Sequence, residues 1–179
     1  MGCYADFTFP ALGTLSQPKI VNKIYYPSKD RFNPKSYDSG AEMQRGRPQN
    51  GLILLPGPIL FDFKKMKFDD GRIEPNFLLS IDRLRNWQRA NIHVRGCPEW
   101  IFIKLYTHSA REYTRDALFS NETNELYSFL SNQIAHGKFH LHFVTAREAF
   151  NIAKAAGAGE IGEDPMEYFD YQIAPPRNR

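Results

Sequence analysis

The sequence has few cysteines, no long apolar run and little net charge, and each scarcity excludes a class of protein. Its two cysteines, Cys3 and Cys97, are far apart and lack a Cys-x-x-Cys spacing, so a thiolate metal site is not expected and a disulfide has no support. No apolar run approaches the roughly 20 residues that span a bilayer. No signal peptide opens the chain, so we expect no membrane partner and take the cytoplasm as the default location.

Charge and length set two further limits. With 23 basic and 20 acidic residues the chain carries a formal charge of +3 and no basic block, which argues against a nucleic-acid partner. The 179 residues fit one domain, and apolar residues make up 42%, as in a globular chain. A complete (β/α)8 barrel usually takes about 250 residues, so a whole barrel is excluded.

The first part of the chain has the pattern of short strands. Strands are predicted over residues 3–9, 20–26 and 51–55, and a hairpin over residues 67–73 with Asp70-Gly71 as its turn. Residues 27–50 are rich in Pro, Gly and polar residues and are predicted to be a long loop. A strand that begins so close to Met1 leads us to expect that the chain begins inside a larger fold.

The later part alternates helical and strand patterns. Helices are predicted over residues 76–91, from a Ser120 cap to Gly137, and from a Thr145 capping box to Gly157. Strands are predicted over residues 100–106 and 138–144. This alternation is typical of an α/β fold with a parallel sheet, whose chemistry gathers at the carboxyl ends of the strands.

Polar residues follow several of the predicted strands. His108, in the run Tyr106-Thr107-His108-Ser109, suits a general acid or base, and a hydrogen-bonded loop histidine is an equally good interpretation. Asp6 and Thr8 mark another strand end, and Arg147 follows a third. We predict His108 as the catalytic residue and Asp6, Thr8, Tyr106 and Arg147 as substrate-binding residues.

Metal ligands are harder to find. His140 and His142 would share one face of a predicted strand and could bind a metal, although sheets more often hold such histidines by hydrogen bonds. The combination of Asp69-Asp70 with His136 and His140 imitates a metal site, but a hairpin turn explains the aspartates better. We therefore predict no metal ligand. Asp82, Arg83 and Arg85 are predicted to form a solvated helix face.

Several strings resemble the C-terminal portion of a bacterial branch of the polysaccharide deacetylase (NodB-homology) family. The resemblance runs through nearly the whole chain. The strings that carry it are GCYADFTFP (2–10), KIYY (23–26), PKS (34–36), LPGP (55–58), EWIFIKLYTH (99–108) and LHFVTARE (141–148).

The resemblance implies a partial or distorted (β/α) barrel over residues 1–174, with a frayed tail at 175–179 and an acetylated glycan as the substrate. Members of the family use a divalent metal, zinc or a similar ion, held by an aspartate and two histidines, and a late histidine as the acid. His108 matches that late histidine, whereas Tyr106 stands where this branch favours a second histidine. The family's early Asp-Asp and His-x-x-x-His motifs are missing, so the chain alone is not expected to hydrolyse substrate.

Two other functions remain open on the sequence alone. The aromatic residues and the 27–50 segment would suit a non-catalytic carbohydrate-binding or interaction module. A true metalloenzyme using His140, His142 and Asp69 is the third possibility. A half barrel exposes sheet edges, so we also expect homo-oligomers.

Overall fold

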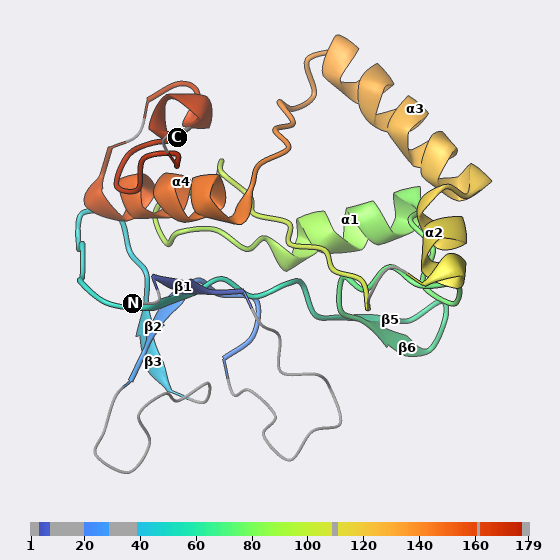
Figure 1. Ribbon diagram of the computed structural model, residues 1–179, viewed down its shortest axis with the longest axis horizontal. Helices are drawn as coiled ribbons and strands as arrows, with labels where there is room; N and C mark the ends of the chain where they lie inside the picture. The colour runs from blue at the N-terminus through green and yellow to red at the C-terminus, as the bar shows by residue number, and fades with distance from the viewer. Residues whose placement is uncertain (1–3, 8–19, 29–38, 109–110, 161, 177–179) are drawn as a thin grey trace. The chain divides into compact units, whose positions relative to one another are not determined.

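The computed structural model describes residues 4–7, 20–28, 39–108, 111–160 and 162–176 (Figure 1). The chain divides into two compact units. The first consists of Met1–Pro56, Ile92–Phe102 and Phe143–Arg179, and the second of Gly57–Asn91 and Ile103–His142. Thr8 and part of the predicted 27–50 loop lie outside the described residues. In the part of the chain that is described, no helix is both long and apolar enough to cross a membrane.

A four-stranded mixed sheet forms the base of the first unit. Its order is β1-β4-β2-β3; β1 pairs in parallel with β4, and the other two pairs are antiparallel. The strands are each only two or three residues long. They are β1 (Ala5–Asp6), β2 (Tyr25–Pro27), β3 (Gly40–Glu42) and β4 (Ile53–Leu54). Residues 40–42, which the sequence predicts to be part of the 27–50 loop, form strand β3 instead.

Helix α4 (Ala146–Ala158) packs on this sheet. Its capping box is confirmed: Thr145 accepts from the Glu148 amide and Glu148 accepts from the Thr145 amide, and Gly159 ends the helix with φ 94°. Every residue from Ala149 to Gly157 is buried. The Phe150 ring meets the Tyr4 ring at 6.0 Å. A short 3₁₀ helix, η1 (Pro165–Tyr168), follows in the chain.

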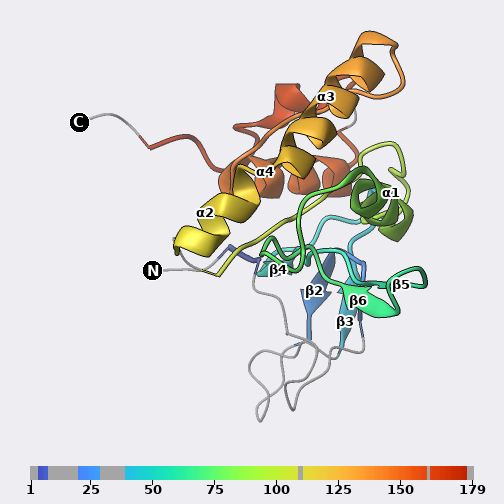
Figure 2. The ribbon, with the colours of Figure 1, turned by 90° about the vertical axis from the view of Figure 1, so that its right-hand side faces the viewer.

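The second unit combines a hairpin with three helices around its own apolar core. Its elements are β5 (Leu60–Asp62), β6 (Lys67–Asp69), α1 (Ile81–Ala90), α2 (Glu112–Leu118) and α3 (Asn121–Ala135). The two figures agree that α1 lies between α3 and the hairpin (Figures 1 and 2). Buried side chains from α1, α3 and the preceding loop make the core: Ile73, Leu79, Leu84, Trp87, Leu126 and Leu130.

Two local predictions in this unit are wrong. The helix predicted from residue 76 begins at Ile81, because Ser80 caps it by accepting from the Arg83 amide. The hairpin turns at residues 63–66 and not at Asp70-Gly71. By contrast, the Ser120 cap of α3 is confirmed by its hydrogen bond from the Thr123 amide.

The mixed α/β class is confirmed, but the described residues show no barrel closure. The predicted parallel sheet of the later half is wrong, since no strand after β6 occurs within the described residues. Residues 101–105 and 139–144 are not in strands: the Phe102 amide donates to the Ile92 carbonyl at 2.8 Å, and the adjoining Tyr106 makes an isolated bridge with Arg72. Ile103, Leu105, Phe139 and Leu141 instead pack against the core of the second unit. Alternation of apolar residues indicates which side chains face the core. It does not indicate which other segment supplies the backbone hydrogen bonds of a strand.

Arg83 is the clearest departure from the predicted solvated face, because it is buried. Its Nε and Nη2 donate to the two carboxylate oxygens of Asp69 at 2.8 Å each, and its remaining donors reach backbone carbonyls, including that of Arg72 at 2.6 Å. Trp87 Nε1 donates to the same carboxylate at 3.3 Å. Burial raises the pKa of Asp69, but the hydrogen bonds and charge of Arg83 outweigh it and leave the pKa below its ordinary value.

Candidate functional site

The candidate site consists of two extended segments that lie side by side in the second unit. The Ile73 amide donates to the Tyr106 carbonyl at 2.8 Å, and the Tyr106 amide donates to the Gly71 carbonyl at 3.2 Å, which makes a parallel bridge between Arg72 and Tyr106. Ile73 enters the core from one segment, and Ile103 and Leu105 pack against that core from the other. Alternation then gives each segment a polar row: Asp70, Arg72 and Glu74 on one, and Lys104, Tyr106 and His108 on the other.

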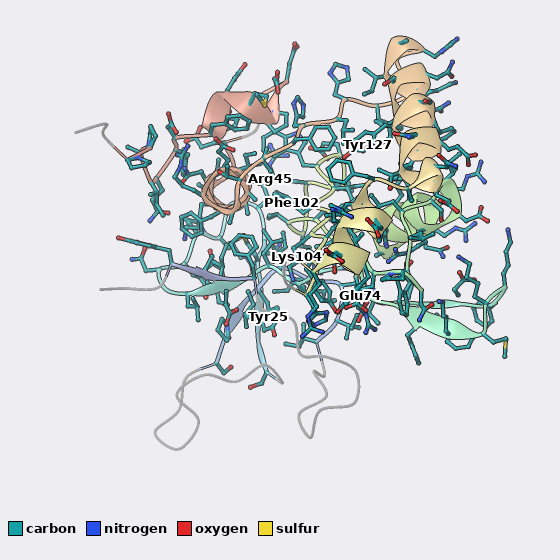
Figure 3. All side chains as sticks on the ribbon, turned by 45° about the vertical axis from the view of Figure 1, so that its right-hand side comes forward. Tyr25, Arg45, Glu74, Phe102, Lys104 and Tyr127 are labelled. Atoms are coloured by element: carbon teal, nitrogen blue, oxygen red, sulfur yellow. The ribbon has the colours of Figure 1, made fainter. Side chains whose placement is uncertain are left out.

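His108 and Glu74 form the pair with the clearest chemical capacity. Nδ1 of His108 lies 2.6 Å from Oε1 of Glu74, and the histidine side chain is 62% exposed. An ionised carboxylate only accepts hydrogen bonds, so Nδ1 carries the proton and donates it. The pair holds the ring in one orientation and leaves Nε2 as the ring nitrogen that can exchange a proton with a bound molecule. Glu74 (Figure 3) is itself held by a backbone turn with Phe77.

Tyr106 packs its ring against the His108 imidazole. Its ring meets the imidazole edge to face at 5.4 Å, and its hydroxyl donates to Oδ2 of the buried Asp70 at 2.9 Å. Nη2 of Arg72 donates to the same oxygen at 3.2 Å. Burial, and then the negative charge of Asp70, raises the pKa of Tyr106 far above its ordinary value. The hydroxyl therefore remains a hydrogen-bond donor at neutral pH and is not a base.

Cations give the site its electrostatic character. The Lys104 ammonium lies 4.8 Å from the centre of the Tyr106 ring, and burial lowers its pKa while Asp70 partly offsets that effect (Figure 3). Arg72 also lies 3.9 Å from Glu74, which brings a second cation beside the His108 pair. The carboxylates of Asp70 and Glu74 balance these two charges, so a carbonyl or an oxyanion would be held by hydrogen bonds from the cations and not by a net positive charge.

The Tyr106 phenol provides a test of this network through pH. A raised pKa in the folded state gives stability that is present below the ordinary value of 10.0 and is lost as pH rises toward the folded value. We expect the free energy of unfolding to fall above pH 10.0 in the wild type and to fall less in Tyr106→Phe. Urea unfolding on both sides of that pH measures it, with the exposed Tyr113→Phe as the control. Parallel pH profiles for wild type and Tyr106→Phe would contradict it.

The other predicted residues belong to the first unit or lie outside the described chain. Asp6 is buried in β1, and Thr8 is not among the described residues. Arg147 donates to the backbone carbonyls of Phe169 and Ile173 at 3.0 and 2.7 Å and to the Asp170 carboxylate at 2.6 Å. It ties the C-terminal segment to α4. The structure thus brings Tyr106 and His108 together, while Asp6 and Arg147 lie in the other unit.

The residues present do not fit the divalent metal that the family resemblance implies. Among the described residues, no group of three or more His, Cys, Asp or Glu side chains is placed to hold a metal ion. Asp69 is committed to Arg83, and His136 Nδ1 bonds the Asn132 carbonyl at the end of α3. His140 and His142 do not lie in a strand, so the predicted strand that would carry them is wrong. No step below uses a metal.

Sequence reasoning missed Asp70, Arg72, Glu74 and Lys104. The predicted hairpin turn at Asp70-Gly71 removed the first segment from consideration. The alternation of apolar 103 and 105 with polar 104, 106 and 108 is visible in the sequence and marks one row of the site. The partner row could not be found, because Glu74 and His108 are 34 residues apart.

Comparisons of this chain with models of protein families, with curated proteins and with solved structures yield no match. The site must therefore be interpreted from its own geometry.

Proposed function

We propose that this chain is the later portion of a polysaccharide deacetylase-like hydrolase and that His108 is its proton donor to the leaving group. The His108–Glu74 hydrogen bond of 2.6 Å is the observation that supports it most directly. Hydrolysis of an N-acetyl or O-acetyl group needs a proton on the departing nitrogen or oxygen. With its Nδ1–H held on Glu74, the imidazole accepts a proton at Nε2 from the attacking water and then passes that proton to the leaving group. The string EWIFIKLYTH, which carries the resemblance, ends on this histidine.

The neighbouring groups suit the same reaction. Arg72 lies beside Glu74, the partner of His108, and Lys104 lies over the Tyr106 ring. In this proposal they supply positive charge where the acetyl carbonyl oxygen becomes negative as water attacks. Tyr106 holds one edge of the imidazole, so Nε2 keeps its direction. A partial, distorted deacetylase barrel completed by a metal-binding half remains part of this proposal. The substrate class is an acetylated glycan.

Binding of acetylated sugars tests the role of His108. We expect N-acetylated chitin oligosaccharides to bind this chain and to shift the His108 ring signals in NMR spectra, while fully deacetylated oligosaccharides do neither. His108→Ala removes a hydrogen bond to the ligand and should weaken binding about tenfold. Glu74→Gln should weaken it less, since the ring stays but loses its fixed tautomer. His136→Ala, an exposed histidine of the same unit, is the control.

Three outcomes would contradict the proposal. Equal affinity for acetylated and deacetylated oligosaccharides would show that the chain does not recognise the acetyl group. Unchanged binding by His108→Ala would place the sugar elsewhere and favour a carbohydrate-binding module. Acetate release that requires His140 and His142 would favour the separate metalloenzyme instead.

A further inference from the structure

The hairpin β5–β6 carries its aromatic side chains on the side that faces away from the core. Phe61 and Phe68 are directly paired across the strands, and the Phe61 ring meets the Phe63 and Phe68 rings at 5.0 and 5.2 Å. Phe63 is 81% exposed and Phe68 50% exposed. The opposite side is the buried one, and it carries Asp62 and Asp69. This hairpin packs its polar side inward and exposes adjacent phenylalanines to solvent. Exposed apolar patches of this kind usually mark an interaction surface.

The turn that joins the strands adds another exposed apolar side chain, Met66, and two cationic side chains, Lys64 and Lys65. Met66, at the end of the turn, is 73% exposed and has a positive φ of 49°. Asp62 Oδ1 accepts hydrogen bonds from the amides of Lys64 and Lys65 at 2.9 and 3.2 Å, and these hydrogen bonds stabilise the conformation of the turn. Phe63 and Met66 therefore stand at its two ends with the two lysines between them. Lys64 also makes an exposed ion pair with Asp82 at 3.3 Å, a kind that contributes little.

We propose that this hairpin tip, residues 63–66 with Phe61 and Phe68, docks on an anionic lipid surface. Phe63 and Met66 enter the boundary between headgroups and acyl chains, and Lys64 and Lys65 face the lipid phosphates. Exposed apolar side chains alternating with lysines are what such a boundary attracts. The sequence-based expectation of no membrane partner rested on the lack of a spanning run and of a signal peptide, and a docking hairpin needs neither.

Other occupants fit the surface less well. A single-stranded nucleic acid needs a groove of cations along its backbone, and this tip offers two lysines. A stable second copy would need about 800 Å² from each partner, usually about 20 residues or more, and this tip consists of six residues. The proposal is independent of the proposed function, because none of its residues belongs to the His108 site.

Vesicle sedimentation tests the proposal with the full chain. We expect the chain to pellet with phosphatidylcholine vesicles that contain about one third phosphatidylserine, and much less with phosphatidylcholine alone. The double variant Phe63→Ala/Met66→Ala should lower the partition coefficient about tenfold or more. Lys64→Gln/Lys65→Gln should lower it about fivefold per lysine, and added salt should do the same. Phe119→Ala, which alters an equally exposed phenylalanine at the end of α2, is the control and should bind as the wild type does.

Circular dichroism of each variant shows whether it is folded. Folding should be kept, because all the altered side chains are exposed. Equal pelleting with neutral and anionic vesicles would overturn the proposal, as would wild-type binding by Phe63→Ala/Met66→Ala. A dimer in solution that this variant converts to a monomer would assign the tip to a second copy instead. Single-stranded DNA binding that is lost in the same variants, without vesicle binding, would also overturn it.

Discussion

Replacing Arg83 with methionine is expected to lower the free energy of unfolding of the second unit by about 3–5 kcal/mol. The change removes both hydrogen bonds to Asp69 and leaves a buried carboxylate with only Trp87 Nε1 and the Gly71 amide as donors. The carbonyls that Arg83 reaches, such as that of Arg72, lose a donor as well. The loss arises chiefly from the unpaired charge, because the methionine itself fits an apolar position.

Trp87 gives a local readout, since its indole nitrogen bonds the same carboxylate. Urea unfolding followed by its fluorescence in a Trp100→Phe background measures the second unit alone. Arg85→Met is the matched control: Arg85 lies on the same helix but is exposed and pairs with Asp82 at 3.4 Å, so a change within about 0.5 kcal/mol is expected. Adding Asp69→Asn to Arg83→Met should restore part of the loss. Equal effects of the two arginine variants would contradict the buried pair as the cause.

The sign of the pH dependence follows from the same pair. The pKa of Asp69 is below its ordinary value of 3.8 in the folded chain, so the stability it contributes is present above that value and is lost as pH falls through the folded pKa. The difference in unfolding free energy between wild type and Arg83→Met should therefore shrink at acid pH.

Replacing Asn151 with alanine is expected to release the C-terminal segment from α4 and to cost about 2–4 kcal/mol. Asn151 is fully buried, and its side chain makes four hydrogen bonds to the backbone of residues 169–173. Its amide donates to the Phe169 and Ile173 carbonyls, and its carbonyl oxygen accepts from the Gln172 and Ile173 amides. Alanine leaves the Gln172 and Ile173 amides without this acceptor, and water must then enter to satisfy them, whereas Arg147 still donates to the Phe169 and Ile173 carbonyls.

Hydrogen exchange measures the release directly, because the amides of Gln172 and Ile173 lose their acceptor. Both amides should exchange much faster in Asn151→Ala, and proteolysis should cut the segment sooner. Gln172→Ala is the control, since it shortens an exposed side chain and keeps the backbone hydrogen bonds. Arg147 also holds this segment, so Arg147→Ala should weaken it in the same direction. Unchanged exchange in Asn151→Ala would show that the segment does not depend on this side chain.

The sequence by itself determined the parts of the protein that are local. The Thr145 capping box and the Ser120 cap bond residues three positions away, so α4 and α3 begin where the sequence predicts. The alternation in residues 103–105 is local as well: Ile103 and Leu105 pack against the core, although all three side chains, that of Lys104 included, are half-buried. His108 stood out as a polar residue after an apolar run, without any knowledge of its partner.

Tertiary structure decided everything that depends on a distant partner. Arg83 was predicted as a solvated residue because its helix pattern is charged, and only Asp69, 14 residues earlier, makes it a buried one. Residues 101–105 have the composition of a strand, yet a strand needs a neighbouring backbone, and the chain provides an isolated bridge at Tyr106 instead. Glu74 gained a role only when the parallel bridge between Arg72 and Tyr106 set it beside His108. Local patterns encode caps and faces, whereas pairing is a property of the folded chain, because its free energy comes from groups that sequence separates.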